Sequence, residues 1–586
     1  MHRLRRPALL TTSLLAAAAI SGAGVSAGLG SAAGAVVPDP VEASAADAAL
    51  ALTPLGTAST GIFDESAAEI VAHHPGSDRA FVVNAAEKVV DVLDLSDPTA
   101  PVEEFSFDAT GLTDRAGAVV PEGSNPNSVA VRRDGLGVVA LENATKTDDG
   151  WLVFFDARGT DPEDTLLGAV RVGALPDMVT FSPDGRFAVV ANEGEPSEDY
   201  TVDPEGSVGV VTLPKRVRAP QQGAVRTAGF AAYEADGRKQ LPAGVRVFAG
   251  VEGADRPVSA GLEPEYVAVD RRSRTAYVVL QEANATAVVD LRRARVRDIW
   301  SFGAKDHGAA GNGLDTSDRD EAIDIAPVPG LQGLYLPDGM NVYTVRGEEY
   351  LVTANEGDAR EWGDYAEPAR VGDLGEDGLA PICEDSPLAG RTDAADLGRL
   401  NVTTASGLGS EGCYEELYAF GGRSFSIWTT DGEQVFDSGD ELERVTAEAA
   451  PDFFNSNHSE SNLEGRSDDK GPEPENLTIG RVQGRTYAFI GLERIGGVAV
   501  YDITAPRQAR FVTYVNNRDF SVSMEDVLEA GTEDPDEALD RAGDLGAEGL
   551  TFVKGKDSPL GQPLLLVANE VSGTTTVFGV EALGAR

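Results

Sequence analysis

Alternating hydrophobic and polar residues in the middle of the chain predict a four-stranded antiparallel sheet. Residues 265–270 (EYVAVD) alternate as a half-buried strand does, and residues 271–274 (RRSR) form a polar turn. The β-branched segment 275–281 predicts a second strand, and residues 286–290 and 298–302 predict a third and a fourth. The short turns between these segments favour antiparallel pairing of successive strands.

The same unit recurs along the chain. Clear copies cover residues 177–213 and 475–502, and fainter copies begin near Glu69, Asn127, Asn341, Glu416 and Glu548. Sheet units at a spacing of about 40–60 residues, with almost no helical periodicity between them, are typical of a β-propeller. We therefore predict an all-β fold, a propeller of about seven or eight four-stranded blades.

The two ends of the repeat region predict how the ring closes. The last unit supplies three clear strands, ending with residues 574–580, and the strand-like segment 52–60 precedes the first unit. Pairing of this N-terminal strand with the last blade would remove two exposed sheet edges. We expect residues 50–586 to form a single domain, with long loop insertions at 230–261 and 357–412.

The N-terminus resembles a secretory signal. Arg3, Arg5 and Arg6 precede the apolar run 9–20, and residues 25–27 and 33–35 offer small-residue cleavage sites. We expect residues 1–35 to be a cleaved signal peptide and small-residue leader, and the Arg5-Arg6 pair is compatible with twin-arginine export. The apolar run is too short for a membrane anchor. No later membrane span and no C-terminal anchor are expected, so we predict a secreted monomer.

The charge balance limits the partners. The chain carries 96 acidic and 48 basic residues, a net charge of −48. Such a surface repels nucleic-acid phosphates and anionic lipid and attracts cations. Adaptation to a salty exterior, where screening shortens the repulsion, explains the same composition.

Cys383 and Cys413 are the only cysteines. In an oxidising compartment we expect them to form a disulfide, which closes a loop of roughly thirty residues and contributes about 3 kcal/mol. No CxxCH, P-loop or Rossmann glycine motif occurs, so neither haem nor a nucleotide is expected as a cofactor.

Four sequence segments of the chain resemble those of a known family. They are Gly313–Asp320 (GLDTSDRD), Tyr350–Arg360 (YLVTANEGDAR), Tyr414–Trp428 (YEELYAFGGRSFSIW) and Arg466–Glu475 (RSDDKGPEPE). In these the chain resembles the choice-of-anchor I group of exported bacterial proteins, which is related to the mesenchyme-specific cell surface glycoprotein of sea urchins. The resemblance spans about residues 60–580 and implies a YVTN/WD40-like propeller. Its members attach to cells by varied C-terminal devices, and some carry alkaline-phosphatase labels.

Acidic or amide residues recur at two positions of the repeat, the start of the first strand and the end of the second. Because these strands are antiparallel neighbours, both positions lie at the same edge of a blade, and ring closure gathers them around one mouth of the central channel. Crowded oxygen ligands suit Ca²⁺ or another hard divalent cation. The predicted metal ligands are Glu69, Asp177, Glu193, Glu265, Glu356, Asp358, Glu475, Glu548 and Glu570. The same residues would also serve as polar caps on hairpin ends.

Two charged segments are candidates for substrate binding. Asp468, Asp469 and Lys470 lie in a proline-stiffened loop directly before a first strand, and Arg360 follows the acidic segment 356–358. A lysine or arginine beside a cation ligand could hold a phosphate. An exposed charged loop is the alternative for both.

Three functions remain open. The first is a cation-binding extracellular interaction or matrix protein, with an extracellular protein, glycan or phosphoester as further ligand. The second is a metal-dependent phosphoesterase, alkaline phosphatase-like or phytase-like, in which a cation polarises the phosphoryl group. The third is a scaffold whose acidity serves solubility alone. No catalytic residue is assigned.

Overall fold

The computed structural model describes residues 33–34, 36–114, 117–248, 256–363 and 365–584. The predicted signal peptide, residues 1–35, lies outside the described residues apart from a two-residue strand at Ala33–Gly34. None of the helices in the described part of the chain combines the length and hydrophobicity that a membrane crossing needs.

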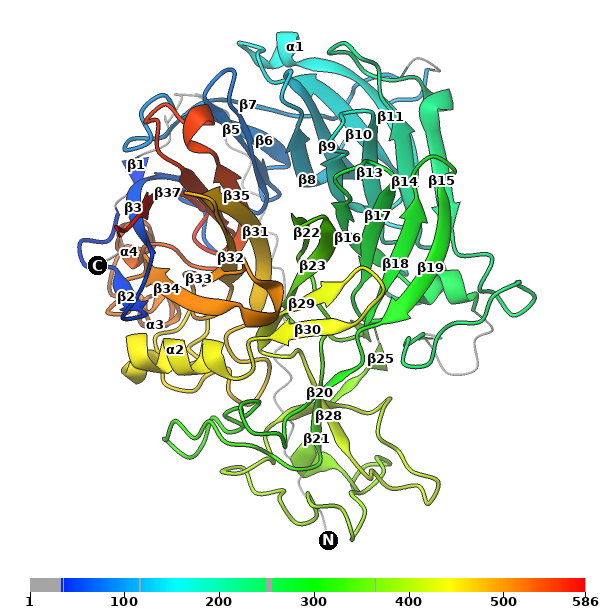
Figure 1. The fold of residues 1–586 in the computed structure, drawn as a ribbon, viewed down its shortest axis with the longest axis vertical. Helices are drawn as coiled ribbons and strands as arrows, with labels where there is room; N and C mark the ends of the chain where they lie inside the picture. Colours follow the sequence, from blue (N-terminus) through cyan, green and yellow to red (C-terminus); the bar gives the residue numbers. More distant parts are fainter. Residues whose placement is uncertain (1–32, 35, 115–116, 249–255, 364, 585–586) are drawn as a thin grey trace, which may run out of the picture. The chain divides into compact units, whose positions relative to one another are not determined.

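Seven antiparallel sheets form the blades of a propeller, so the all-β prediction is confirmed with seven blades (Figure 1). The strands of each blade are given from the innermost outwards. Blade 1 consists of β4 (Val71–His74), β5 (Arg79–Asn84), β6 (Val89–Asp94) and β7 (Val102–Phe107), and blade 2 of β8 (Asn125–Val131), β9 (Leu136–Glu142), β10 (Asp149–Asp156) and β11 (Leu166–Ala174). Blade 3 consists of β12 (Pro176–Phe181), β13 (Phe187–Asn192), β14 (Ser207–Thr212) and β15 (Val225–Gly229), and blade 4 of β16 (Pro264–Val269), β17 (Thr275–Leu280), β18 (Ala285–Asp290) and β19 (Arg295–Ser301).

Blades 5 to 7 continue in the same direction around the ring. Blade 5 consists of β22 (Met340–Val345), β23 (Glu348–Asn355), β29 (Ser424–Thr429) and β30 (Gln434–Asp437). Blade 6 consists of β31 (Pro474–Val482), β32 (Arg485–Leu492), β33 (Val498–Asp502), β34 (Arg510–Asn516) and β2 (Val41–Ser44). Blade 7 consists of β35 (Ala547–Val553), β36 (Leu564–Asn569), β37 (Thr574–Ala582), β3 (Leu50–Ser59) and β1 (Ala33–Gly34). The innermost strands β4, β8, β12, β16, β22, β31 and β35 contact one another in this order, and β35 contacts β4. The ring is therefore closed.

The closure uses the N-terminal strand, as predicted. β3 pairs antiparallel with β37 from Leu50↔Ala582 to Ser59↔Thr574 and so supplies the outermost full strand of the last blade. Just before it in the chain, β2 pairs with β34 of blade 6. One N-terminal segment thus binds the last two blades together and covers the outer edges of both sheets.

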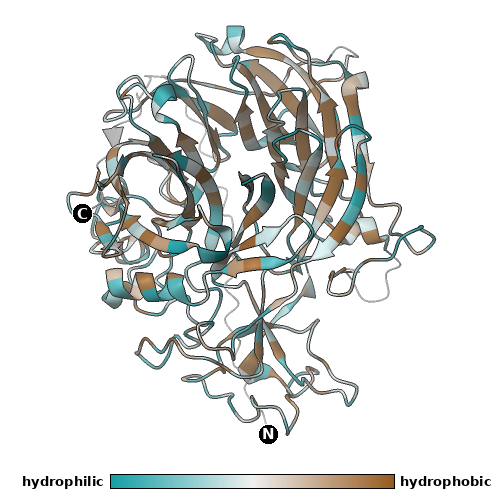
Figure 2. Ribbon diagram, viewed as in Figure 1, coloured by the Kyte–Doolittle hydropathy of each residue, from teal (hydrophilic) through white to brown (hydrophobic). Residues whose placement is uncertain are grey.

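An apolar cluster fills each of the seven spaces between neighbouring blades. The alternation of the strands is the reason, because each sheet buries residues on both faces against its two neighbours. Figure 2 shows hydrophobic residues concentrated on the blade strands, whereas the loops are largely hydrophilic. Four short helices, α1 (Pro162–Thr165), α2 (Glu441–Ala449), α3 (Met524–Ala530) and α4 (Pro535–Ala542), lie in connections between strands.

Residues 303–337 and 357–423, here called the insertion, contain a sheet of their own outside the blades. The sheet has the order β20 (Ala304–Asp306), β21 (Leu331–Leu334), β28 (Leu417–Phe420), β27 (Asn401–Thr403), β26 (Pro368–Arg370), and a hairpin of β24 (Glu361–Trp362) and β25 (Tyr365–Ala366) lies beside it in the chain. The predicted disulfide between Cys383 and Cys413 is confirmed within this insertion.

The insertion changes the assignment of blade 5. The sequence repeat suggested a separate blade beginning near Glu416, but residues 417–420 are β28 of the insertion and residues 424–429 are β29, the third strand of blade 5. The chain leaves blade 5 after β23 and returns beside its own exit. A Cβ at Gly357 (φ +106°) would overlap the backbone nitrogen of Gly421, so this neck requires glycine.

Leu52 gives a test of the ring closure. Its side chain is 2% exposed within the apolar cluster between blades 6 and 7, whereas the neighbouring Thr53 is exposed. We expect Leu52→Ala to lower the free energy of unfolding by about 2–4 kcal/mol in denaturant titrations. Thr53→Ala on the same strand is the control and should change it by less than about 0.5 kcal/mol. Equal effects of the two substitutions would contradict the tight packing of β3 on the last blade.

Candidate functional site

The starts of the innermost strands surround a hollow of about 400 Å³, here called the central cavity. Its lining comes from every blade region of the ring and is predominantly acidic or amide. The side chains are Glu69, Ile70, Asn125, Asn127, Ser128, Glu142, Lys146, Leu175, Asp177, Met178, Glu193, Glu195, Tyr266, Asp338, Asn476 and Glu548. Residues from position 69 to position 548 therefore meet at one site because the ring is closed.

A local irregularity directs the strand-start residues into the cavity. In blades 3, 4, 6 and 7 the inner strand has one extra residue near its start, relative to the strand with which it pairs. In blade 3, for example, the extra residue lies between the pairs Pro176↔Asn192 and Val179↔Val190. Such a bulge turns a side chain out of the regular alternation. Proline is compatible with this position, since the inner strand is a sheet edge and its missing N–H costs no ladder bond.

An asparagine and the glutamate that follows it have different roles at the end of the second strand in blades 3, 5 and 7. Asn192, Asn355 and Asn569 are at most 1% exposed, and each donates to a hydroxyl on the third strand of its blade. The residue that follows each asparagine is a glutamate whose pKa is raised mainly by burial; neighbouring carboxylates raise it further, and Lys470 opposes them at Glu356. The amide thus fixes the end of the hairpin. The glutamate that follows joins the strand-start and strand-end carboxylates in and beside the cavity, here called the acidic centre.

Asp338, Glu475 and Glu548 form what we call the acidic triad. They come from the strand starts of three consecutive blades, and one carboxylate oxygen of each lies within 4.8 Å of the others. No basic side chain of the described residues forms an ion pair with these three carboxylates, and the Glu475 Oε2 atom is buried without a hydrogen-bond partner. Burial, and then the surrounding carboxylates, raise the pKa of each well above its usual range.

Basic residues neutralise the neighbouring part of the centre. Lys470 is 7% exposed, and its Nζ atom lies 2.6 Å from Glu356 Oε1 and 3.0 Å from Glu473 Oε2. Burial favours the neutral form of Glu473, but Lys470, Arg466 and Arg494 overcome it and hold the pKa of Glu473 far below its usual range. The cost of burying these charges is met by close pairing.

Two further sets of side chains have the spacing of metal ligands. They are Glu356 with Glu475 and Glu493, and His458 with Glu493 and Glu570. Both sets contain Glu493, whose Oε1 atom is 2.9 Å from the Arg494 guanidinium, and Glu356 is already paired with Lys470. A basic side chain is therefore paired with a carboxylate of each of these two sets, whereas no basic side chain of the described residues is paired with the acidic triad.

The comparison with known proteins agrees with the architecture. The model of the choice-of-anchor I domain matches residues 69–506, most of the chain. The chain belongs to the choice-of-anchor I family. The match begins at Glu69, the first strand-start carboxylate, and includes blades 1 to 5, the three inner strands of blade 6 and the whole insertion.

Two curated proteins are similar to parts of this choice-of-anchor I chain. Gigasin-3a of Magallana gigas is 32% identical over 194 residues, which are 32% of this chain and 66% of the relative. The mesenchyme-specific cell surface glycoprotein of Strongylocentrotus purpuratus is 30% identical over 276 residues, 42% of this chain and 35% of the relative. The chain thus spans less than two thirds of the length of either relative.

Solved structures with similar topology have low sequence identity. Hydrazine synthase of Kuenenia stuttgartiensis is 14% identical, with 89% of this chain and 97% of that chain covered and a TM-score of 0.40. The WD40 domain of Toxoplasma gondii coronin is 9% identical, with 94% and 89% covered and a TM-score of 0.39. The propeller assignment of this choice-of-anchor I domain comes from its own strand pairing and closed ring.

The predicted metal ligands fall into two groups in the choice-of-anchor I structure. Glu356, Glu475, Glu548 and Glu570 belong to sets with metal-ligand spacing. Glu69, Asp177 and Glu193 line the central cavity but belong to no such set among the described residues. Glu265 is buried, is not part of the cavity lining and belongs to no such set within the described chain either. Asp358 is largely exposed, and its Oδ1 atom is 3.5 Å from Lys470 Nζ.

The predicted substrate-binding residues hold the insertion and its neighbouring loop. Arg360 is 5% exposed and forms an ion pair with Glu263. Asp468 pairs with Arg370 at 2.8 Å and with Arg399 at 2.9 Å, both in the insertion. Asp469 pairs with Arg466, three residues before it, at 3.0 Å. None of these residues, nor Lys470, lines the central cavity. The structure thus places them in ion pairs rather than on an open binding surface.

Asp338 is the functional candidate that the sequence reasoning missed. A signal for it exists: Pro126-Asn127, Pro176-Asp177, Pro264-Glu265, Pro337-Asp338 and Pro474-Glu475 repeat one dipeptide at five strand starts. The blade-5 repeat was placed at Asn341, three residues too late to include it. Asp338 lies two residues before β22 and completes the ring of strand-start residues.

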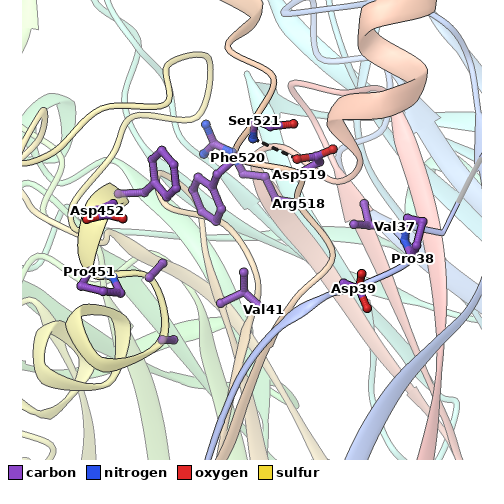
Figure 3. Close-up of a pocket in the computed structure, with 13 residues that line it drawn as sticks. Val37, Pro38, Asp39, Val41, Pro451, Asp452, Arg518, Asp519, Phe520 and Ser521 are labelled. Carbon is purple, nitrogen blue, oxygen red and sulfur yellow. Dashed lines mark hydrogen bonds between the residues drawn. The ribbon is translucent and has the colours of Figure 1, made fainter.

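A second hollow of about 530 Å³ lies away from the acidic centre (Figure 3). Val37 and Val41 of the N-terminal segment line it together with Phe453 and Phe520, whose rings stack with centroids 4.8 Å apart. Asp519 accepts a hydrogen bond from the Ser521 N–H at its rim. No set of metal-ligand spacing includes a residue of this lining within the described chain, so the candidate site is the central cavity with the acidic triad.

The pKa of Glu69 gives a pH test of the acidic centre. Burial, and then the charges of Glu570, Asp177 and Glu142, raise its pKa to about 8, although a Ser66 hydrogen bond lowers it. The folded chain therefore keeps a proton that the unfolded chain releases near pH 4.5, and this contribution to stability is lost as the pH rises towards 8. In chelator-treated protein we expect the melting temperature to fall over this range, by a few degrees less in Glu69→Gln.

The matched control is Glu537→Gln, because Glu537 is exposed on α4. Its melting temperature should follow that of the wild type at every pH. Identical pH profiles for Glu69→Gln and the wild type would show that Glu69 does not titrate in this range.

Proposed function

We propose that this choice-of-anchor I protein is an extracellular propeller that binds a hard divalent cation, such as Ca²⁺, at Asp338, Glu475 and Glu548. The observation that carries the proposal is the acidic triad itself. Three carboxylates from three blades approach within 4.8 Å, and no basic side chain of the described residues pairs with them.

Physical chemistry supports a cation there. Three like charges in a partly dehydrated site either take up protons or bind a counter-ion. Oxygen donors alone favour Ca²⁺ or Mg²⁺ over softer ions, and water can supply the ligands beyond the three carboxylates. Ca²⁺ fits best, because it accepts irregular sets of six to eight oxygens, whereas Mg²⁺ requires a regular octahedron.

An extracellular location fits three observations. The chain begins with a basic and then apolar segment of the secretory type, and the insertion contains a disulfide. A relative of this chain is named as a cell surface glycoprotein. Calcium is abundant outside cells, and extracellular modules use sites of 10⁻⁴–10⁻³ M affinity. We infer a binding or matrix role in which the cation stabilises the central cavity and presents it to a ligand.

The phosphoesterase alternative has less support. A phosphate needs free basic groups near the cation, but Lys470, Arg466 and Arg494 are paired with Glu356, Glu473 and Glu493. Arg360 is paired with Glu263. The remaining surface of the cavity carries carboxylates, which repel a phosphoryl dianion. Binding without phosphoryl chemistry is therefore the function that we propose.

The test is chelation and re-addition of metal. Removal of the cation should lower the melting temperature, and Ca²⁺ at a hundredfold excess over Kd should restore about 2.7 kcal/mol of stability. Glu475→Gln should reduce the calcium response at least tenfold in affinity, since Glu475 contributes to two oxygen sets. Metal analysis of the purified wild type should give bound calcium.

Two controls separate site binding from general screening of the −48 charge. Glu537→Gln, exposed on α4, should keep the full calcium response, and NaCl at equal ionic strength should not replace Ca²⁺. The proposal fails if chelator and calcium leave the melting temperature unchanged, or if both variants respond equally.

A further inference from the structure

The acidic side chains of the central cavity are arranged in two different ways. Asp338 and Glu548 belong to the acidic triad, whose oxygens can share one ion. Glu69, Glu142, Asp177, Glu193 and Glu195 line the rest of the cavity, and none of them belongs to a set with metal-ligand spacing in the part of the chain that the structure describes. No three of these side chains therefore come close enough to one another to share one bare metal ion.

The cavity has room for more than an ion. Its volume is about 400 Å³, whereas one water molecule occupies about 30 Å³ of liquid. Seven carboxylates and one ammonium, that of Lys146, are among its lining groups. The Lys146 Nζ atom is 3.7 Å from Glu195, so even this cation is engaged. An anionic occupant is excluded by charge, and a cationic one is favoured.

Unpaired oxygens support the same conclusion independently of the charge count. Glu265, at the bulge of β16, is 6% exposed, and its Oε2 atom has no hydrogen-bond partner. The next residue, Tyr266, lines the cavity, and the pKa of Glu265 is raised by burial first and then by the charges of Glu282 and Glu193. The Oδ1 atom of Asn125, in the cavity lining, is buried without a partner as well. Buried acceptors normally have a hydrogen-bond partner, so these two oxygens favour a ligand that donates hydrogen bonds.

We propose that the central cavity binds a small organic polyamine, a molecule with two or more ammonium groups joined by short aliphatic segments. Each ammonium group brings three donors, which suit the dispersed carboxylates and the Asn125 carbonyl oxygen. Ile70, Leu175 and Met178 provide apolar contact for methylene groups between the charges. The proposal goes beyond the cation at the acidic triad, which it leaves in place as one wall of the cavity.

The binding geometry predicts which side chains matter. Asp177 and Glu193 come from the start of β12 and the end of β13 in blade 3, and both lie outside the sets with metal-ligand spacing. Replacing these carboxylates by amides, in Asp177→Asn and Glu193→Gln, should weaken polyamine binding without removing the cation from the acidic triad. This separation distinguishes the polyamine site from the cation site of the proposed function.

The experiment is calorimetric titration of calcium-saturated protein with spermidine. We expect saturable binding of one spermidine per chain, weakened at least tenfold in Asp177→Asn and in Glu193→Gln. The calcium-dependent rise in melting temperature should be retained in both variants, which also shows that they are folded. 1,8-Octanediol, an uncharged molecule of similar length, should not bind.

The control is the double variant Asp536→Asn/Glu537→Gln, which removes two exposed acids of α4 and should bind spermidine as the wild type does. Equal affinities for this variant, Asp177→Asn and Glu193→Gln would mean diffuse attraction to the acidic surface and would overturn the proposal. So would loss of spermidine binding in Glu475→Gln together with unchanged binding in the two blade-3 variants, because spermidine would then occupy the acidic triad. Failure of the calcium response alone, with spermidine binding retained, would refute the cation site and not the polyamine site.

Discussion

The pairing of β3 with β37 is the constraint on which the site depends. This N-terminal strand completes the last blade, and the last blade contacts the first through β35 and β4. Closure fixes the distances among seven inner strands that start far apart in the sequence. Without it the strand-start carboxylates of the first and last blades would separate, because like charges repel one another. The apolar clusters between neighbouring blades supply the opposing free energy, because each is a dry interface of large side chains.

The acidic centre is electrostatically uneven, and this unevenness gives it chemistry. Around Glu473 three basic side chains neutralise the carboxylates, so this part is a structural ion-pair network. At the acidic triad no basic side chain of the described chain takes that place. A network that is satisfied stabilises its own geometry, whereas an unsatisfied group of acceptors has a free energy to gain from a ligand. The satisfied half therefore supports the half that is available for binding.

Much of the fold could be predicted from the sequence, because blade strands carry local signals. Alternation located the strands, and the unpaired segment 52–60 predicted the closure that β3 provides. The insertion sheet was not predicted, since its central pair, β21 with β28, joins segments more than eighty residues apart. This parallel pair has no turn between its strands that the sequence could reveal. Glu416 consequently looked like the start of a blade.

The candidate site, like the fold, was predictable where the signal is local in the sequence and not where it depends on contacts between distant segments. Hairpin ends have a fixed place in a blade, so the gathering of Glu69, Asp177 and Glu548 follows from the repeat and is what the structure describes. Ion-pair partners have no such rule. Asp468 meets Arg370 and Arg399 across the boundary with the insertion, and Arg360 meets Glu263 from the preceding blade. Local charge alone could not show that these side chains are occupied.

The insertion and the acidic centre are joined through the backbone as well as through charge. Glu356 ends blade 5 at the ion-pair network, Gly357 forms the neck, and Arg360 anchors the next segment to Glu263. Only three residues separate Glu356, a carboxylate of the centre, from Arg360, an anchor of the insertion. A change in the position of Glu356 must therefore move the neck, and the buried pairs of Arg360 and Asp468 resist that movement. The disulfide-bonded insertion thus helps to hold the second strand end of blade 5 in place, so that the propeller and its insertion share one set of buried charges.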